Sequence, residues 1–179
     1  GYFGGVVDSL LQRLVEVMMS LPGILLALAL VAVLGSGVNK VIIALSIMYL
    51  PWTLRVIRAS VLSVRRNIYI DAAQSIGAGP IRIMVRHVVP NVTAPYLILA
   101  SSLLGNAILT EASLSFLGLG VPPPVPSWGR MLADSVAQYA RSAPWVVVFP
   151  GMAITWLVLG FNLVGDALRD AWDPRLRKG

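Results

Sequence analysis

The sequence has no cysteine, and only one of its 179 residues is a histidine. The missing cysteines exclude a disulfide-bonded scaffold and a metal site built on thiolates. A single histidine argues against an internal metal centre, because such a centre combines several ligands. Paired carboxylates or a nucleophile with its base cannot be assembled from the sequence either, so an enzyme is the least supported class of function.

Charged residues are also scarce. They make up 12% of the chain against 57% hydrophobic residues, and the mean hydropathy is +0.80. Since soluble domains carry about 25% charged residues, this composition indicates an integral membrane protein. The net charge of +6 could indicate nucleic-acid binding in a soluble protein. Here the basic residues flank apolar runs, which favours contact with anionic lipid headgroups.

Four apolar runs reach the length of about 20 residues that a helix needs to cross about 30 Å of hydrocarbon. Three of them are residues 17–35, 92–110 and 142–165. The remaining run starts at Val41, stays uncharged to Leu54 and reaches this length by continuing helically through Arg55 and Arg58, which can snorkel to the interface. Backbone polar groups in lipid must be satisfied within the segment, so these runs predict helices and an all-α, polytopic membrane bundle. Kinks are predicted at Pro22, Pro51, Pro95 and Pro150. Residues 6–16 predict an amphipathic helix at the membrane interface.

The basic residues predict the orientation of the chain. All lysines and arginines except Lys40, Arg130 and Arg141 fall on the side that holds residues 70–91. The positive-inside rule therefore places residues 70–91 and both chain ends in the cytoplasm, and the loop of residues 118–143 outside.

Residues 70–91 form a polar interval between apolar runs. Residues 70–76 predict a short helix with Asp71 near its positive end and Gly77 in a left-handed cap. Pro80 begins a second helix over residues 81–89, which we expect to end at Pro90. Its expected apolar face consists of Ile81, Met84, Val85 and Val88. Two short helices bent about a glycine would form a compact knob.

The spacing in this knob resembles the EAA loop of bacterial ATP-binding-cassette (ABC) importer permeases. The matching residues are Asp71, Ala72, Ala73, Gly77, His87, Val89 and Pro90. Asp71 stands where glutamate is usual, and His87 stands where isoleucine is usual. The run EASLSFLGLG followed by VPPPVPSWG (residues 111–129) and the C-terminal FNLVGDALRDAWDPRLRK (residues 161–178) are similar to signatures of the peptide and nickel permeases. Weaker likeness in YFGG and LPGILLALALV extends the resemblance over nearly the whole chain.

The resemblance implies the type I importer permease fold, with residues 1–179 as one transmembrane domain in a bacterial inner membrane. Permeases of this family resemble six-span proteins, and the chain opens without an initiator methionine, so we expect two further spans before Gly1. The implied partners are a homologous permease, two ATPase subunits and a periplasmic or lipid-anchored solute-binding protein. No GxxxxGK followed by Ser or Thr occurs in the sequence. ATP and Mg²⁺ are therefore expected on the partner ATPase, with no cofactor on this chain.

Three groups of residues carry the functional expectations. The residues expected to couple to the ATPase are Asp71, Ala72, Ala73, Ile76, Gly77, His87 and Pro90. The residues expected beside the binding protein are Pro122, Pro124, Ser127 and Trp128. The possible polar residues of the path are Ser102, Asn106 and Glu111.

Each group has a plainer interpretation. The proline-rich loop could merely cap the path, Ser102 and Asn106 suit helix packing, and Glu111 could be a hydrated carboxylate at a helix end. His87 is better explained by packing than by a pH switch. The alternative function is a secondary transporter or channel without an ATPase. Such proteins generally place ionisable residues near the bilayer midplane, and none of these spans has one near its centre.

Overall fold

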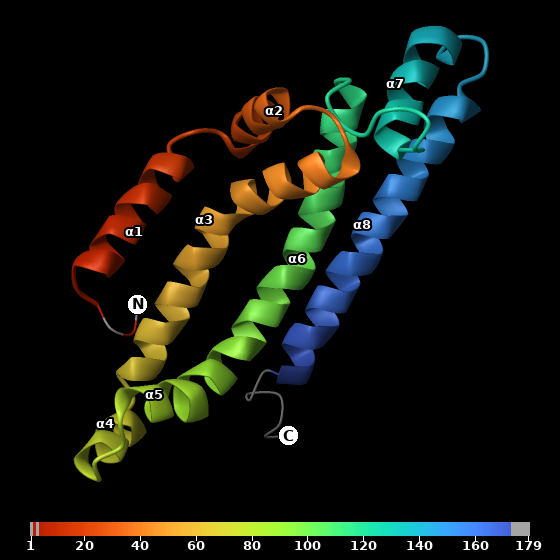
Figure 1. Cartoon of the computed structure of the whole chain (residues 1–179). Helices are drawn as coiled ribbons and strands as arrows, with labels where there is room; N and C mark the ends of the chain where they lie inside the picture. Colours follow the sequence, from red (N-terminus) through yellow and green to blue (C-terminus); the bar gives the residue numbers. More distant parts are fainter. Residues whose placement is uncertain (1, 3, 173–179) are drawn as a thin grey trace. The chain divides into compact units, whose positions relative to one another are not determined.

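The computed structural model describes residue 2 and residues 4–172, and every regular element within them is helical (Figure 1). The elements are α1 (Gly5–Met19), α2 (Gly23–Leu34), α3 (Val38–Arg65), α4 (Ile68–Ser75), α5 (Pro80–Ile83), the π-helix η1 (Met84–Val88), α6 (Val89–Phe116), α7 (Trp128–Tyr139) and α8 (Trp145–Trp172). The all-α prediction is confirmed. Phe3 and the end of the C-terminal signature, with Arg175, Arg177 and Lys178, lie outside the described residues.

Among the described residues, three helices are long and apolar enough to cross a membrane: Val38–Arg65, Pro80–Phe116 and Trp145–Ala171. A fourth span exists only if α1 and α2 together form one broken span. The span expected over residues 17–35, with a kink predicted at Pro22, is thus fully interrupted near that proline. Pro22 lacks an N–H and disfavours helical geometry in the residue before it, so α1 ends at Met19 and α2 restarts at Gly23. With 12 residues, α2 rises only about 18 Å.

The other three expected spans coincide with α3, α6 and α8. Each contains a proline in its interior, namely Pro51, Pro95 and Pro150, and none of these prolines ends its helix. The interior prolines therefore differ from Pro22, which occupies the N-cap of α2.

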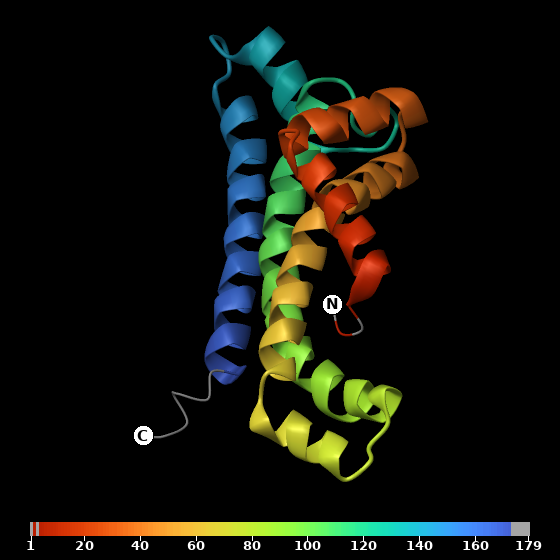
Figure 2. The ribbon, with the colours of Figure 1, turned by 90° about the vertical axis from the view of Figure 1, so that its left-hand side faces the viewer.

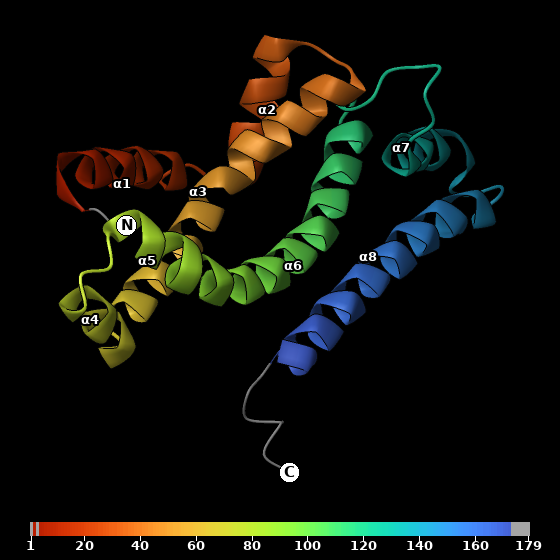
Figure 3. The same cartoon turned by 60° about the horizontal axis from the view of Figure 1, so that its bottom comes forward.

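The chain divides into two compact units. The first comprises the described parts of Gly1–Ser20, Pro51–Ala100 and Gly165–Gly179. Its core is formed by Ile70, Ala73, Ile83, Val88 and Val92, and side chains from the second half of α3 pack against it. Figure 3 shows α4 turning back after α3, and α5 running into α6 without a loop. Burial in this unit is therefore concentrated where residues 70–92 fold against α3.

The second unit comprises Leu21–Leu50 and Ser101–Val164. Its core joins Ala27 and Val31 of α2, Val41 and Ala44 of α3, and Leu114 of α6. Close backbone approach also contributes to its packing. A Cβ placed on Gly105 of α6 would lie 3.2 Å from Oδ1 of Asn162 in α8, so the glycine allows these two helices to meet.

The second helix of the knob differs from the prediction. It does not end at Pro90, because α5, η1 and α6 follow one another directly. The wide π-turn lets the helix continue past Pro90, which has no N–H to donate. The N–H of Val89 donates to the carbonyl of Met84, five residues back, and the carbonyl of His87 accepts a 2.6 Å bond from Nδ2 of Asn91. Carbonyls near the proline thus retain donors, which is how a π-turn allows a helix to continue.

The same π-turn changes the buried face. Ile83 and Val88, five residues apart, are buried together, whereas Ile81 and Val85 are exposed and Met84 is half-buried. The expected face of Ile81, Met84, Val85 and Val88 assumed a regular 3.6-residue period and was therefore wrong except at Val88.

One helix was not foreseen. The loop expected at residues 118–143 is irregular only as far as Ser127, after which α7 begins at Trp128. The proline run between α6 and α7 forms no helix, as expected, but it is not extended throughout, because the N–H of Val125 donates to the carbonyl of Pro122 at 3.3 Å and closes a turn. The backbone of α7 lies close to α6, because a Cβ on Gly129 would overlap the backbone of Ala112.

Candidate functional site

The turn between α4 and α5 is set by Gly77. Its φ is +82°, a conformation that side-chain-bearing residues rarely adopt. The N–H of Gly77 donates to the carbonyl of Gln74 at 2.9 Å, and the N–H of Ala78 donates to the carbonyl of Ala73 at 3.0 Å. These two bonds form a Schellman motif. Both the left-handed cap and the position of Asp71 in the first turn of α4 agree with the expectations from sequence.

The knob separates residues that hold it together from residues that face outward. Asp71, Ala72 and Ile76 are exposed, and the Ile76 side chain retains 86% of its accessible surface. Ala73 is buried in the knob's own core, so among these coupling residues it acts as internal packing. Figure 2 shows α4 and α5 lying against each other beyond the end of α3. An exposed isoleucine at the tip of a packed turn is suited to contact another protein.

His87 and Pro90 lie farther along the same segment. The His87 ring is half-buried and lies 6.0 Å from the Tyr69 ring, centroid to centroid, at an interplanar angle of 47°. This contact ties η1 to α4 and supports the packing interpretation of the histidine. Pro90 is exposed at the start of α6.

The proline-rich segment between α6 and α7 is fixed by one carboxylate. Oε1 of Glu111 accepts hydrogen bonds from the Ser115 hydroxyl at 2.6 Å and from the Ser127 hydroxyl at 3.1 Å. The Ser115 oxygen in turn accepts the N–H of Val121 at 3.2 Å. Glu111 thus bonds directly to the end of the segment at Ser127 and is linked through Ser115 to its beginning at Val121, which makes it a structural anchor rather than a simply hydrated carboxylate.

The residues expected beside a binding protein differ in their exposure. Pro124 and Trp128 are exposed, Pro122 is half-buried, and the Ser127 hydroxyl is directed to Glu111. Beneath the segment lies an open, mainly apolar cavity of about 690 Å³. Its walls include Leu104, Ile108, Glu111, Val125, Trp128 and Met131.

Two of the expected polar residues of α6, Ser102 and Asn106, follow one helical row. Ser102 and Asn106 are exposed, and Asn106 Nδ2 donates to the carbonyl of Ser102 at 3.2 Å. Thr110 continues the row, and its hydroxyl lies 2.9 Å from the hydroxyl of Tyr49 in α3. The Tyr49–Thr110 hydrogen bond could not be predicted from the sequence, because the two residues are 61 positions apart. By contrast, the spacing of Glu111 and Ser115 on one helix could have suggested their bond.

Within the described residues, no three histidine, cysteine, aspartate or glutamate side chains gather at one place as metal ligands. The described residues form an exposed knob, a proline-rich segment anchored by a carboxylate and a polar row on a long apolar helix.

Comparison with known proteins decides the family. Residues 1–178 match the model of the family described as "Binding-protein-dependent transport system inner membrane component". The chain belongs to this family. Its members have the type I fold of ABC permeases, so the expected fold class is confirmed, and the family is described as a transport component. The match also supports a multi-pass protein of the inner membrane.

Several named members of the family are similar to this chain. The dipeptide transport system permease protein DppC of Alkalihalophilus pseudofirmus is 45% identical over 177 residues, covering 99% of this chain and 58% of the relative. A putative peptide transport system permease of Brucella suis is 47% identical over 170 residues, covering 95% and 57%. The glutathione transport system permease GsiD of Escherichia coli is 45% identical over 176 residues, covering 98% and 58%. The chain thus spans less than three fifths of the length of these family members.

Proposed function

We propose that this chain forms part of the permease subunit of an ATP-driven importer for peptides or a related solute. In this proposal, residues 70–91 receive motion from a separate ATPase, and the chain contributes to half of the translocation path. Membership of the family supports this function, and the three relatives described above are named for dipeptide, peptide and glutathione transport.

The surroundings of Gly77 carry the coupling role. A Cβ at this position would meet nothing within 4 Å, so the tip of the turn is open on its outer side. Exposed Ile76 lies beside it, and Asp71 and Ala72 are exposed on the same helix. The knob is therefore packed internally by its own core and bare at its tip, which is the form expected of a surface that seats in a groove of a partner.

The remaining roles complete the proposal. The exposed row of Ser102 and Asn106 supports a polar lining for the path. The segment with Pro122, Pro124, Ser127 and Trp128 is assigned to the neighbourhood of a solute-binding protein, since rigid prolines lose little entropy on binding. The partners would be a second, homologous permease, two ATPase subunits carrying ATP and Mg²⁺, and the binding protein.

The proposed orientation places residues 70–91 and the C-terminus in the cytoplasm and the proline segment outside, following the arginine distribution. Cysteine labelling is clean in a chain that has no cysteine of its own. We expect an impermeant thiol reagent to label Val125→Cys but not Ser75→Cys in intact cells. Labelling of Ser75→Cys alone would reverse the orientation.

Gly77→Val tests the coupling role, and Gly118→Val is its matched control. Gly118 has a φ of +80°, closes α6 with the same Schellman bonds and also has nothing within 4 Å of a Cβ. Both substitutions carry backbone strain of about 1–2 kcal/mol. We expect both proteins to insert in the membrane, and only Gly77→Val to lose ATPase subunits on co-purification and to stop transport.

Two results would contradict the proposal. If Gly77→Val co-purifies with its ATPase at the normal ratio and retains substrate-stimulated ATP hydrolysis, Gly77 merely ends a surface helix. If transport by the unmodified protein continues when its ATPase partner cannot hydrolyse ATP, the chain belongs to a transporter of a different class.

A further inference from the structure

Helix α1 is held in the first unit by very little apolar packing. Of its 15 residues only Val15 is buried, while Val6, Leu10, Leu14 and Val17 are all more than half exposed. Apolar contacts specify the position of a helix through interlocking side chains, and one buried valine provides little of this. Polar contacts must therefore supply much of what fixes α1 along its neighbour.

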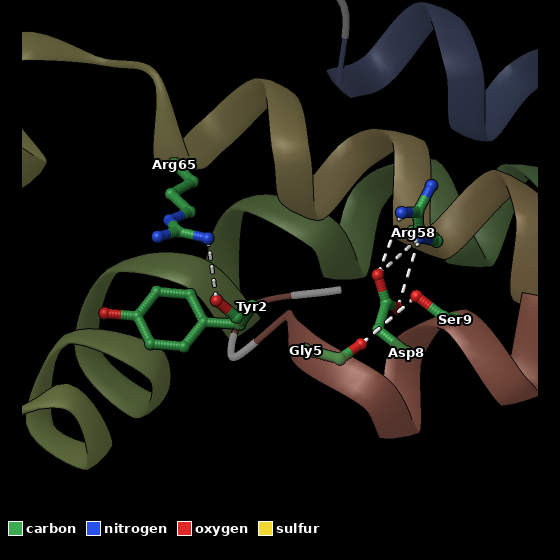
Figure 4. Close-up of polar contacts among 6 residues, drawn as sticks. All are labelled: Tyr2, Gly5, Asp8, Ser9, Arg58 and Arg65. Atoms are coloured by element: carbon green, nitrogen blue, oxygen red, sulfur yellow. Dashed lines mark hydrogen bonds and ion pairs between the residues drawn. The ribbon is translucent and has the colours of Figure 1, made fainter.

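The main polar contact is a paired aspartate and arginine (Figure 4). Nη2 of Arg58 in α3 donates to Oδ2 of Asp8 at 2.8 Å, and Nε donates to both carboxylate oxygens at 3.2 Å. This is the two-pronged geometry in which a guanidinium grips a carboxylate most specifically. The Asp8 side chain is 13% exposed and the Arg58 side chain 34% exposed, so the pair is partly shielded from solvent.

A second ion pair on α1 provides an internal contrast. Nη1 of Arg13 lies 3.8 Å from Oε2 of Glu16, which is three residues farther along the same helix. The two side chains are 84% and 67% exposed. Such a pair holds nothing to α3 and contributes little, because exposed pairs are screened and mobile. Only the Asp8–Arg58 pair joins α1 to α3 through opposite charges in the described residues.

A slip of α1 along α3 would break the Asp8–Arg58 pair. One helical turn is about 5.4 Å, far more than a hydrogen-bonded contact tolerates. A slipped helix would leave two opposite charges partly shielded and unmatched, which is the costly case for ion pairs. Nearby Arg65 extends the same ordering, since its Nη1 donates to the carbonyl of Tyr2 at 3.0 Å and its Cζ lies 5.7 Å from the Tyr2 ring centroid.

The position of α1 also shapes a cavity next to the knob. A mainly apolar cavity of about 470 Å³ is lined by Leu11 and Gln12 of α1, Ile57 and Arg58 of α3, and Met84 and Val88 of η1. The helix that the ion pair fixes is therefore one wall, and the π-turn that continues the knob is another. A change in the register of α1 would alter the space beside η1.

We propose that Asp8 and Arg58 form a register lock, which fixes α1 on α3 and thereby maintains the cavity beside η1. Fixing a register is the best attested use of a shielded ion pair, since its geometry tolerates one arrangement only. The lock itself does not depend on the transport function, whereas its effect on transport rests on the proposed function above.

Thiol crosslinking of the complete permease in its membrane measures the register directly. Met19 and Arg55 offer a reporter site, because Nη1 of Arg55 lies 4.0 Å from the Met19 sulfur. The Met19→Cys, Arg55→Cys pair is placed in four backgrounds: the unmodified chain, Asp8→Arg, Arg58→Asp and the double exchange Asp8→Arg, Arg58→Asp. Arg13→Asp is the matched control, since it makes the same substitution in the exposed pair.

We expect each single reversal to lose most of the product formed with a short bismaleimide, and the double exchange to regain it. Arg13→Asp should crosslink like the unmodified chain. Normal crosslinking in both single reversals would overturn the lock. Loss of the crosslinked product in both single reversals without its recovery in the double exchange would also overturn the lock. That result would mean that the two charges act independently and not as a pair.

The exchange also decides the outcome if the single reversals fail to accumulate. Recovery of the membrane level to normal in the double exchange then supports the pairing, and failure to recover overturns it. Transport by the same variants is measured separately. A chain that crosslinks as expected yet transports nothing in any background leaves the lock intact and counts against the proposed function.

Discussion

Two turns beside α6 end a helix in the same way but hold the following chain by different means. Gly77, before α6, and Gly118, after it, both have positive φ and both close Schellman motifs. After Gly77 the chain enters another helix, packed through the buried side chains of Ile83 and Val88. After Gly118 the chain runs through prolines held by the bonds of Glu111 to serine hydroxyls.

The difference shows that the glycine cap alone does not determine a region's function. An apolar core fixes a shape through volume and does not itself constrain the side chains on the exposed surface. A polar anchor fixes a segment through a few directed bonds, so loss of the Glu111 acceptor removes the direct hold on Ser127 and leaves the Ser115 hydroxyl without its acceptor. We therefore expect both the knob and the proline-rich segment to keep their shape when surface residues are substituted. They should differ in the buried change that disrupts them, which is loss of a core side chain in the knob and loss of the Glu111 carboxylate in the segment.

The largest expected effect lies where α7 begins, immediately after the proline-rich segment. Gly129→Leu places a side chain where even a Cβ overlaps the backbone of Ala112. Since neither helix can yield locally, we expect more than about 3 kcal/mol of destabilisation and little accumulation in the membrane. Gly160→Ala in α8 is the control, because a Cβ there meets nothing within 4 Å. Normal accumulation of Gly129→Leu would show that α7 does not pack on α6 in this way.

The next effect concerns the apolar core of the knob. Ile83 is 1% exposed and Val85 is 61% exposed. We expect Ile83→Ala to cost about 2–5 kcal/mol and Val85→Ala little. Protease cleavage within residues 70–91 in inside-out vesicles should accelerate only for Ile83→Ala. Equal cleavage of the two variants would mean that a regular helical face, rather than the π-turn, packs the knob.

The smallest effect concerns the polar anchor of the proline-rich segment. Glu111→Ala removes the acceptor of two hydroxyls, a loss of about 1–3 kcal/mol. Glu111→Gln keeps a carbonyl oxygen and should retain much of the anchoring. Thiol labelling of Pro124→Cys should accelerate in Glu111→Ala and change less in Glu111→Gln. If neither variant alters the labelling rate, the prolines rather than the carboxylate fix the segment.

Features that depend on neighbouring residues, such as long apolar helices and a glycine cap, could be predicted from the sequence. Apolar length identified the helices α3, α6 and α8, and the Asp71-to-Gly77 spacing identified the knob and its cap. The 3.6-residue period failed at Ile83, because a π-turn adds one residue and shifts every following side chain. Pro22 broke a run that composition alone made continuous. The expectation of spans before Gly1 stays a prediction.

Contacts between distant residues could not be predicted in this way. The carboxylate of Glu111 meets Ser127 across 16 positions, and Asp8 meets Arg58 across 50. Each partner alone suits a hydrated surface or a helix end, and only the folded backbone selects the pair. Helix α7 was missed because a proline-rich run before it dominated the composition of residues 118–143.

The direct succession of α5, η1 and α6 has a mechanical consequence. A loop between the knob and α6 would absorb a displacement by bending, because loops contain few internal hydrogen bonds. Here the backbone bonds continue through the π-turn, from Pro80 into the first turns of α6. A displacement at the tip of the knob would therefore be transmitted directly to α6, because no flexible loop lies between them.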